Sequence, residues 1–111
     1  MAEKTTLVST QRVSFTDIQD RLCEKLVVDP VNIVHRRFGK VEVMELIFEK
    51  YYFRTGSFAC LTILLLRPDE EHVQVDITAA AGGVGILDIS WGSQKNFFKA
   101  GKAILEEFGF C

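Results

Sequence analysis

Ala79-Ala80-Ala81-Gly82-Gly83-Val84-Gly85, running on to Ser90-Trp91-Gly92-Ser93, joins the most regular predicted strand to the last predicted helix. Three glycines fall within four residues here, and the only tryptophan of the chain follows them. Glycine costs backbone entropy, so such a cluster indicates a turn, a bulge or the close approach of another group. We expect either a tight turn with a helix packed on the small residues, or a loop whose amides face a bound anion.

The anion interpretation lacks the usual sequence context. Phosphate-binding glycine loops lead directly into the N-terminus of a helix. Here Gly85 is followed by Ile86-Leu87-Asp88-Ile89, which is typical of a strand. The spacing also differs from the dinucleotide-binding fingerprint, and no Gly-Lys-Ser/Thr follows.

The composition indicates one ordinary globular domain. The chain has 111 residues, of which 48% are hydrophobic and 25% charged, so we expect a single domain over residues 1–111. Its net charge of −2 argues against nucleic acid and membrane surfaces as partners. The longest apolar run, at residues 59–66, is far shorter than the roughly 20 residues of a membrane span, and we expect no leader peptide.

The three cysteines are widely spaced and form no Cys-x-x-Cys motif. This usage indicates reduced thiols, and therefore a cytoplasmic protein without a zinc or redox motif. Cys60 lies in an apolar run, which favours an inert thiol in the core.

Local signals define the first helix. Ser14 is a good N-cap, and apolar residues then recur at helical spacing. The residue before Pro30 avoids the helical region, so we expect the element to end by Asp29. The predicted buried face consists of Phe15, Ile18, Leu22 and Leu26.

Several strands are expected between the two helices. Residues 41–54 and 58–66 carry apolar side chains at both parities, which is typical of strands covered on both sides. From Val73 apolar and polar residues alternate cleanly, so one side of that strand should face water. Turn signals separate these three strands, as in an antiparallel meander.

Three other segments complete the chain. Residues 5–11 are typical of a strand, and residues 84–90 would form another after a glycine turn. Residues 31–40 alternate weakly, so that segment stays undecided between strand and loop. It contains the basic run His35-Arg36-Arg37 with Lys40 nearby, either a solvated loop or an anion site.

The last helix should begin at a Ser93 cap and stop at Gly109. Glycine within a helix costs roughly 1 kcal/mol relative to alanine, so Gly101 indicates close approach to the sheet, near Ala80. The predicted apolar stripe consists of Phe97, Ala100 or Gly101, Ile104, Leu105 and Phe108.

Together these elements predict an α+β fold with the order β-α-β-β-β-β-α. We expect a single antiparallel sheet of about four to five strands, with both helices packed on one face.

The chain also resembles a known family through several motifs. These are Phe48-Glu49-Lys50-Tyr51-Tyr52-Phe53-Arg54, residues 57–66, Gly82-Gly83-x-Gly85 and Ser90-Trp91-Gly92. Their order is similar to that of an uncharacterised bacterial family of about this length, known only as a domain of unknown function. The resemblance implies no activity, substrate or site residue, but it implies that the tyrosine-arginine and glycine-tryptophan stretches belong together.

No pattern in the sequence indicates catalysis. Glu45 and Glu49 would lie roughly 13 Å apart along a strand, too far to act as an acid/base pair. The nucleophile elbow is absent, and nothing in the spacing pairs His35 with His72 as metal ligands. We therefore expect no catalytic residue, no metal and no cofactor, and the sequence disfavours an enzyme.

Two functions remain open. The first is a non-catalytic binding or self-associating protein, a homo-oligomer with a dimer favoured, because two helices cover only one face of a sheet that is apolar on both. The second is a pocket between the sheet and the last helix for a small apolar or anionic ligand. The aromatic lining of that pocket would be Phe48, Tyr52, Trp91, Phe97 and Phe98. The candidate ligand-binding residues are Tyr52, Arg54, Gly82, Gly83, Gly85 and Trp91.

Overall fold

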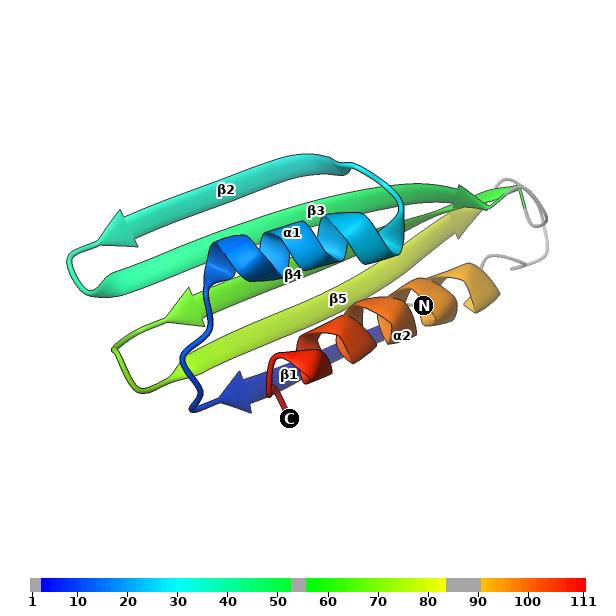
Figure 1. Cartoon of the computed structure of the whole chain (residues 1–111). Coiled ribbons are helices and arrows are strands. Elements are labelled where there is room, and N and C mark those ends of the chain that lie inside the picture. Colours follow the sequence, from blue (N-terminus) through cyan, green and yellow to red (C-terminus); the bar gives the residue numbers. More distant parts are fainter. Residues whose placement is uncertain (1–2, 53–55, 84–90) are drawn as a thin grey trace.

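The computed structural model describes residues 3–52, 56–83 and 91–111, which form one five-stranded antiparallel sheet and two helices (Figure 1). The strands are β1 (Glu3–Ser9), β2 (Pro30–Phe38), β3 (Val41–Tyr52), β4 (Ser57–Arg67) and β5 (Val73–Gly83), and the helices are α1 (Phe15–Leu26) and α2 (Trp91–Glu107). This confirms the α+β class and the order β-α-β-β-β-β-α.

The strands lie in the order β1-β5-β4-β3-β2. Strands β2 to β5 form an antiparallel meander, and β1 adds to its β5 side. The undecided segment 31–40 is thus an edge strand. Its side chains are mostly exposed, and therefore it lacks the apolar alternation that marks a half-buried strand.

Helix α1 forms as its local signals predict. The Ser14 side chain accepts a hydrogen bond from the Asp17 amide at 3.3 Å, which satisfies one of the unpaired amides of the first turn. Val27, with a left-handed φ of 56°, ends the helix three residues before Pro30. All four predicted apolar positions, Phe15, Ile18, Leu22 and Leu26, are buried.

Helix α2 differs from the prediction at its start and in its packing. It begins at Trp91, so Ser93 lies within the first turn and is not the cap. A Cβ on Gly101 would lie 2.9 Å from Cδ2 of Leu61, so the helix approaches β4 closely there. The predicted neighbour, Ala80, is exposed on the other face of the sheet.

The glycine stretch begins inside a strand. Gly82 and Gly83 pair with Phe58 and Ser57 of β4, so the prediction of a turn at these two glycines is wrong. The additional strand predicted for residues 84–90 lies outside the described residues. Among the described residues, the four strands between the helices are β2, β3, β4 and β5.

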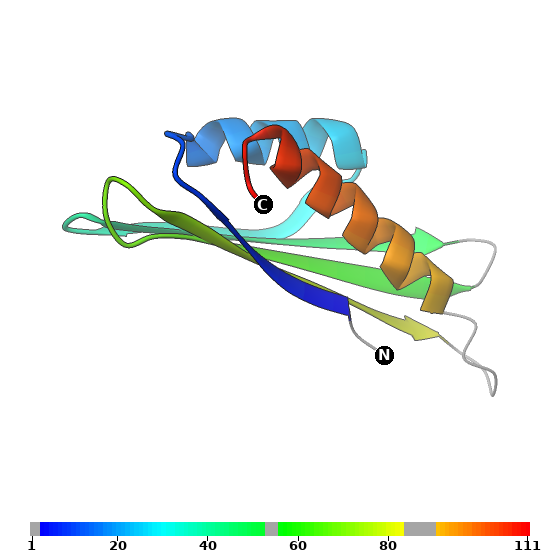
Figure 2. The ribbon, with the colours of Figure 1, turned by 90° about the horizontal axis from the view of Figure 1, so that it is seen from below.

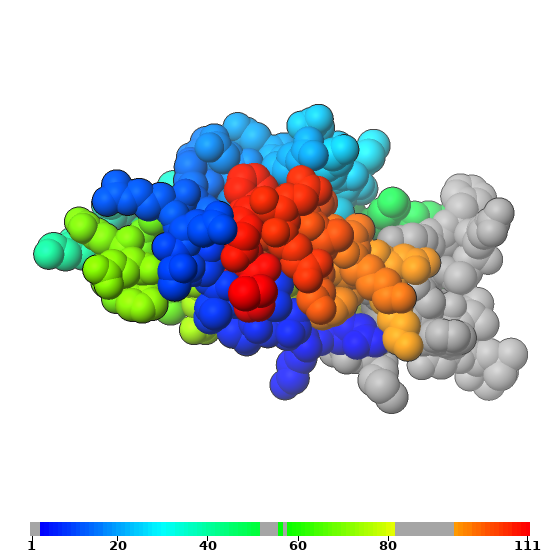
Figure 3. Space-filling model, turned by 60° about the horizontal axis from the view of Figure 1, so that its bottom comes forward, coloured from blue at the N-terminus to red at the C-terminus, as the bar shows by residue number. Residues whose placement is uncertain are grey.

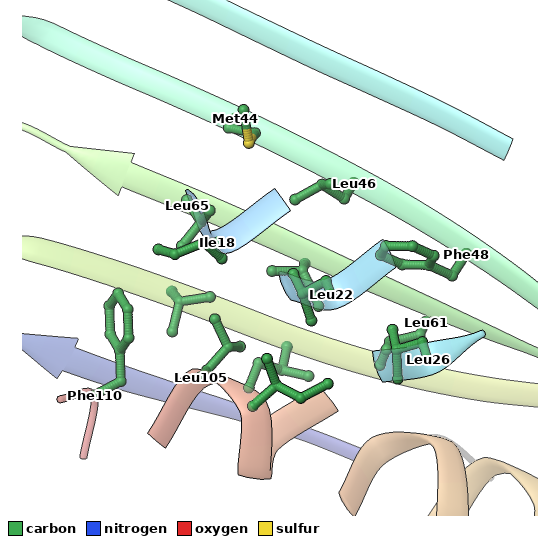
Figure 4. Packing of buried hydrophobic residues seen from close by; sticks show 14 of the residues in the cluster. Ile18, Leu22, Leu26, Met44, Leu46, Phe48, Leu61, Leu65, Leu105 and Phe110 are labelled. Atoms are coloured by element: carbon green, nitrogen blue, oxygen red, sulfur yellow. The ribbon is translucent and has the colours of Figure 1, made fainter. Parts of the chain in front are cut away.

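The core lies between the sheet and the two helices (Figure 4). Figure 3 shows α1 and α2 side by side over this face of the strands. Among the side chains with no exposed surface are Ile18, Leu22, Met44, Leu46, Phe48, Leu61, Ile63, Leu65, Val75, Ile77 and Leu105.

The end of the chain closes one edge of the sheet. Val8 and Cys111 exchange two backbone hydrogen bonds, of 3.1 and 3.0 Å, and the Phe110 side chain is buried. An unpaired strand edge is a site for further pairing, and the tail covers part of this one at β1.

Candidate functional site

The side chains of the central strands that point away from the helices form what we call the open face of the sheet. Figure 2 shows both helices on the opposite side, and no helix of the described residues lies on the open face. Alternation along the strands assigns the following residues to it: Val41, Val43, Glu45, Ile47, Glu49 and Tyr51 from β3, Phe58, Cys60, Thr62, Leu64 and Leu66 from β4, and Gln74, Asp76, Thr78 and Ala80 from β5.

Apolar side chains of β3 and β4 lie on the open face. Val43 pairs with Leu66 across β3 and β4. Leu64 and Ile47 belong to the next two cross-strand pairs on this face. These side chains are half-buried, since no helix of the described residues packs on them and their cover comes from neighbouring side chains of the same face.

One end of the open face carries an exposed aromatic pair. The ring centroids of Tyr51 and Phe58 are 4.8 Å apart, and the two residues are 47% and 51% exposed. Gly82 is the β5 neighbour of Phe58 and has no side chain to cover that ring. Contiguous exposed apolar surface of this kind marks interaction sites more often than isolated apolar residues do.

The charged residues of the open face differ in sign between the central strands and the edge strands. Glu45 and Asp76 flank Leu64 on either side, and Asp76 accepts a hydrogen bond of 2.6 Å from the Thr6 hydroxyl. The basic residues Lys4 and Arg36 belong to the edge strands β1 and β2, in the rows of Thr78 and Val43. Carboxylates therefore lie in the middle and cations at the rim.

A cleft of about 840 Å³ lies at the far end of the sheet from the glycine stretch, on the helix side, where α1 begins. The Glu42 carboxylate lies in this cleft with only 10% of its side chain exposed. Its oxygens are 2.6 Å from Nε2 of His35, 3.4 Å from Nε of Arg67 and 3.5 Å from a terminal guanidinium nitrogen of Arg37.

Arg67 connects this charge cluster to the start of α1. One of its terminal N–H groups donates to the backbone oxygen of Val13, and its guanidinium lies 4.8 Å from the centroid of the Phe15 ring. Its buried Nε is within ion-pair distance of Glu42 but makes no hydrogen bond to the described residues. The cluster thus fixes the N-terminus of α1 against the sheet.

The sequence profile described as "Family of unknown function (DUF6054)" matches residues 2–109. The chain belongs to this family. No curated protein and no solved structure matches it. The resemblance to a domain of unknown function is thereby confirmed, and DUF6054 carries no activity that could be transferred to particular residues.

In this DUF6054 protein, three of the candidate ligand-binding residues lie at one end of the sheet. Tyr52 and Gly83 both pair with Ser57, from opposite sides of β4, and Gly82 is next to Gly83. Trp91 is the first residue of α2. Arg54 and Gly85 lie outside the described residues. The structure therefore places the ends of β3 and β5 on either side of β4, and a ligand there stays a prediction.

Part of the lining predicted for a pocket between the sheet and α2 is buried in the core. Phe48 and Phe97 are 0% and 2% exposed and belong to the packed core of the DUF6054 fold. Phe98 is partly buried and packs against the same core. These rings fill the space between the layers, and the cleft described above lies at the other end of the sheet.

The thiols of the DUF6054 chain also differ from expectation. Cys60 lies on the open face and is half-buried, so its interpretation as a core thiol is wrong. Burial, with smaller contributions from Asp20 and Asp29, raises the pKa of the Cys23 thiol above its ordinary value.

Two further features concern the described part of the chain. It contains no group of three or more histidine, cysteine, aspartate or glutamate side chains placed to hold a metal ion. Neither of its helices combines the length and the apolar character needed to cross a membrane.

The sequence pattern drew attention to the basic run at residues 35–37, but it did not indicate that Glu42 lies at the centre of a charge cluster. Its environment depends on the register that aligns Arg37, Glu42 and Arg67 in one row across β2, β3 and β4. Only the alternation of Glu42 with Met44 and Leu46 hinted that its side chain shares the covered face.

Proposed function

We propose that this protein is a non-catalytic, cytoplasmic binding domain that associates with a second copy of itself through the open face. The observation that carries the proposal is the group of apolar side chains Val43, Ile47, Leu64 and Leu66, which alternate with polar residues on the open face and which the described helices leave uncovered. Burying apolar surface stabilises a complex by roughly 25 cal/mol per Å², so a second layer on this face is favoured. The cytoplasmic setting is supported by three free cysteines.

The open face has the dimensions of a dimer interface. Strands β3, β4 and β5 have 12, 11 and 11 residues, and β2 and β1 are shorter. With a rise of about 3.4 Å per residue and a strand spacing of about 4.8 Å, this side of the sheet measures roughly 550 Å² over β3 to β5 and roughly 800 Å² over all five strands. A stable interface buries about 800 Å² on each partner, so one copy of the sheet suffices to cover the other.

The charges on the open face favour a second copy over a polyanion. Glu45, Glu49 and Asp76 occupy its central strands and would repel a nucleic acid backbone. Lys4 and Arg36 at the rim give the face both signs of charge, and a two-fold related copy can match a face that carries both.

Sedimentation equilibrium of the wild type and of Leu64→Lys tests this function. The lysine would lie between Glu45 and Asp76, so the fold should be kept, and circular dichroism checks this. Ala103→Lys adds the same charge on the exposed surface of α2, away from the open face, and is the matched control.

We expect a dimer for the wild type and for Ala103→Lys, and a folded monomer for Leu64→Lys. A wild type that stays monomeric at about 100 μM, where even a weak interface would associate, would contradict the proposal. A dimer of Leu64→Lys as stable as that of the wild type would also contradict it.

A further inference from the structure

The cleft at the start of α1 gathers cationic side chains from separate parts of the chain. Arg12 comes from the segment before α1, Arg37 from β2, Lys40 from the turn between β2 and β3, and Arg67 from the end of β4. All four line one cleft of about 840 Å³, which is large enough for a small molecule.

The buried carboxylate in this cleft is already neutralised. Glu42 has His35, Arg37 and Arg67 within 3.5 Å, so it holds these groups in place without needing a further cation. The Arg37 side chain is 65% exposed and reaches Glu42 through one terminal nitrogen. Since a guanidinium carries five N–H donors, most of those of Arg37 remain available at the surface.

Two of the cations have no counter-ion. Arg12 and Lys40 are exposed, and no carboxylate of the described residues lies within 4 Å of either. The N-terminus of α1 adds the amides of Phe15 and Thr16, which a helix cannot pair internally, and the positive end of the helix dipole.

Negative charge is present in the cleft but is outnumbered. Asp17 and Glu70 line it together with Glu42, which makes three carboxylates against the four arginine and lysine side chains. The cleft is thus locally positive in a chain whose net charge is −2. Such a contrast favours a small anion over an extended polyanion, which would also meet the acidic remainder of the surface.

We infer that this cleft binds a small phosphate-bearing anion. Phosphate offers several acceptor oxygens in a tetrahedral arrangement and more than one negative charge, so it can accept hydrogen bonds from Arg12, Arg37 and Lys40 at the same time. The site lies on the helix side of the sheet and does not depend on self-association through the open face.

Isothermal titration calorimetry with inorganic pyrophosphate at low salt tests the inference. The test variants are Arg12→Gln and Lys40→Gln, because both side chains are exposed and neither forms an ion pair with the described residues. Arg36→Gln is the matched control, since Arg36 is adjacent to Arg37 in β2 but points to the open face. A parallel titration with adenosine diphosphate shows whether the bound species is free phosphate or a phosphate ester.

We expect saturable pyrophosphate binding by the wild type, weakened about tenfold by Arg12→Gln and by Lys40→Gln, as for the loss of one charge-assisted contact. Arg36→Gln should bind within about twofold of the wild type, a difference too small for a lost contact. Equal affinity for the two ligands assigns the site to phosphate alone, and tighter binding of the nucleotide assigns it to a phosphate ester.

Two outcomes would overturn the inference. One is the absence of saturable binding of either ligand by the folded wild type. The other is an equal loss of affinity in Arg36→Gln and Arg12→Gln, which would indicate diffuse attraction without a site. The self-association variant Leu64→Lys should keep its pyrophosphate affinity, so a failure of one proposal can be told from a failure of the other.

Discussion

The two faces of strand β4 are similar in sequence and differ in their cover. Leu65 has no exposed surface beneath the helices, whereas its neighbour Leu64 points to the open face and is half-buried. A strand that is apolar on both sides needs a layer on each. The described part of this chain supplies one layer, so the second is expected to come from another molecule.

The sharpest test of this difference compares Leu65→Ala with Leu64→Ala. Truncating a fully buried leucine leaves a cavity, so Leu65→Ala should lower the free energy of unfolding by about 2–5 kcal/mol. Leu64→Ala removes partly hydrated surface and should cost less than about 1.5 kcal/mol in dilute, monomeric protein. Urea unfolding followed by circular dichroism measures both, and equal losses would show that the two faces are equally covered within the monomer.

A pair of glutamates extends the comparison to charged groups. Glu42 lies among His35, Arg37 and Arg67 with 10% of its side chain exposed, whereas Glu45 on the same strand points to the open face. Glu42→Gln removes the counter-charge of partly buried cations and should cost about 2 kcal/mol. Glu45→Gln should change stability by less than about 0.5 kcal/mol. If denaturant unfolding gave the opposite ranking, the Glu42 cluster would not hold α1 to the sheet.

A smaller effect is expected on the alkylation rate of Cys23, which packs against the core. The raised pKa of Cys23 lowers its thiolate fraction at pH 8, and the thiolate is the form that reacts. Cys23 should therefore react with iodoacetamide several times more slowly than the exposed Cys111. Mass spectrometry of each cysteine peptide measures the two rates, and a faster reaction at Cys23 would contradict the burial that raises its pKa.

The elements that were predictable are those whose signals are local. The start and buried stripe of α1 follow from Ser14 and from the spacing of Phe15, Ile18 and Leu22, all within the helix itself. The alternation from Val73 likewise predicted which side of β5 is covered. These signals need no knowledge of the neighbouring strands.

The parts that were missed depend on pairing between distant segments. Strand β2 is an exposed edge, so only its register with β3 reveals it. Gly82 and Gly83 continue β5 because β4 is long enough to pair with them. The cluster around Glu42 requires three strands in register, which the basic run at residues 35–37 alone could not indicate.

The candidate ligand-binding residues and the predicted pocket lining also depend on contacts between distant segments. The family resemblance implies that the tyrosine-arginine and glycine-tryptophan stretches belong together, which stays a prediction. Tyr52 and Gly83 pair with the same residue of β4 from opposite sides, and Arg54 lies outside the described residues. Phe48 and Phe97, which were predicted to line a pocket, belong to the core, because side chains fill the space between the sheet and the helix.

The most direct test of the open face is the alkylation of Cys60 measured over a range of protein concentrations. Cys60 lies on that face, and the exposed Cys111 in the same sample serves as the reference. Association through the open face predicts that Cys60 becomes protected as the concentration rises while the rate at Cys111 stays constant. The protection should be absent in Leu64→Lys. A Cys60 rate that does not change with concentration, in a protein that sediments as a monomer, would contradict the account.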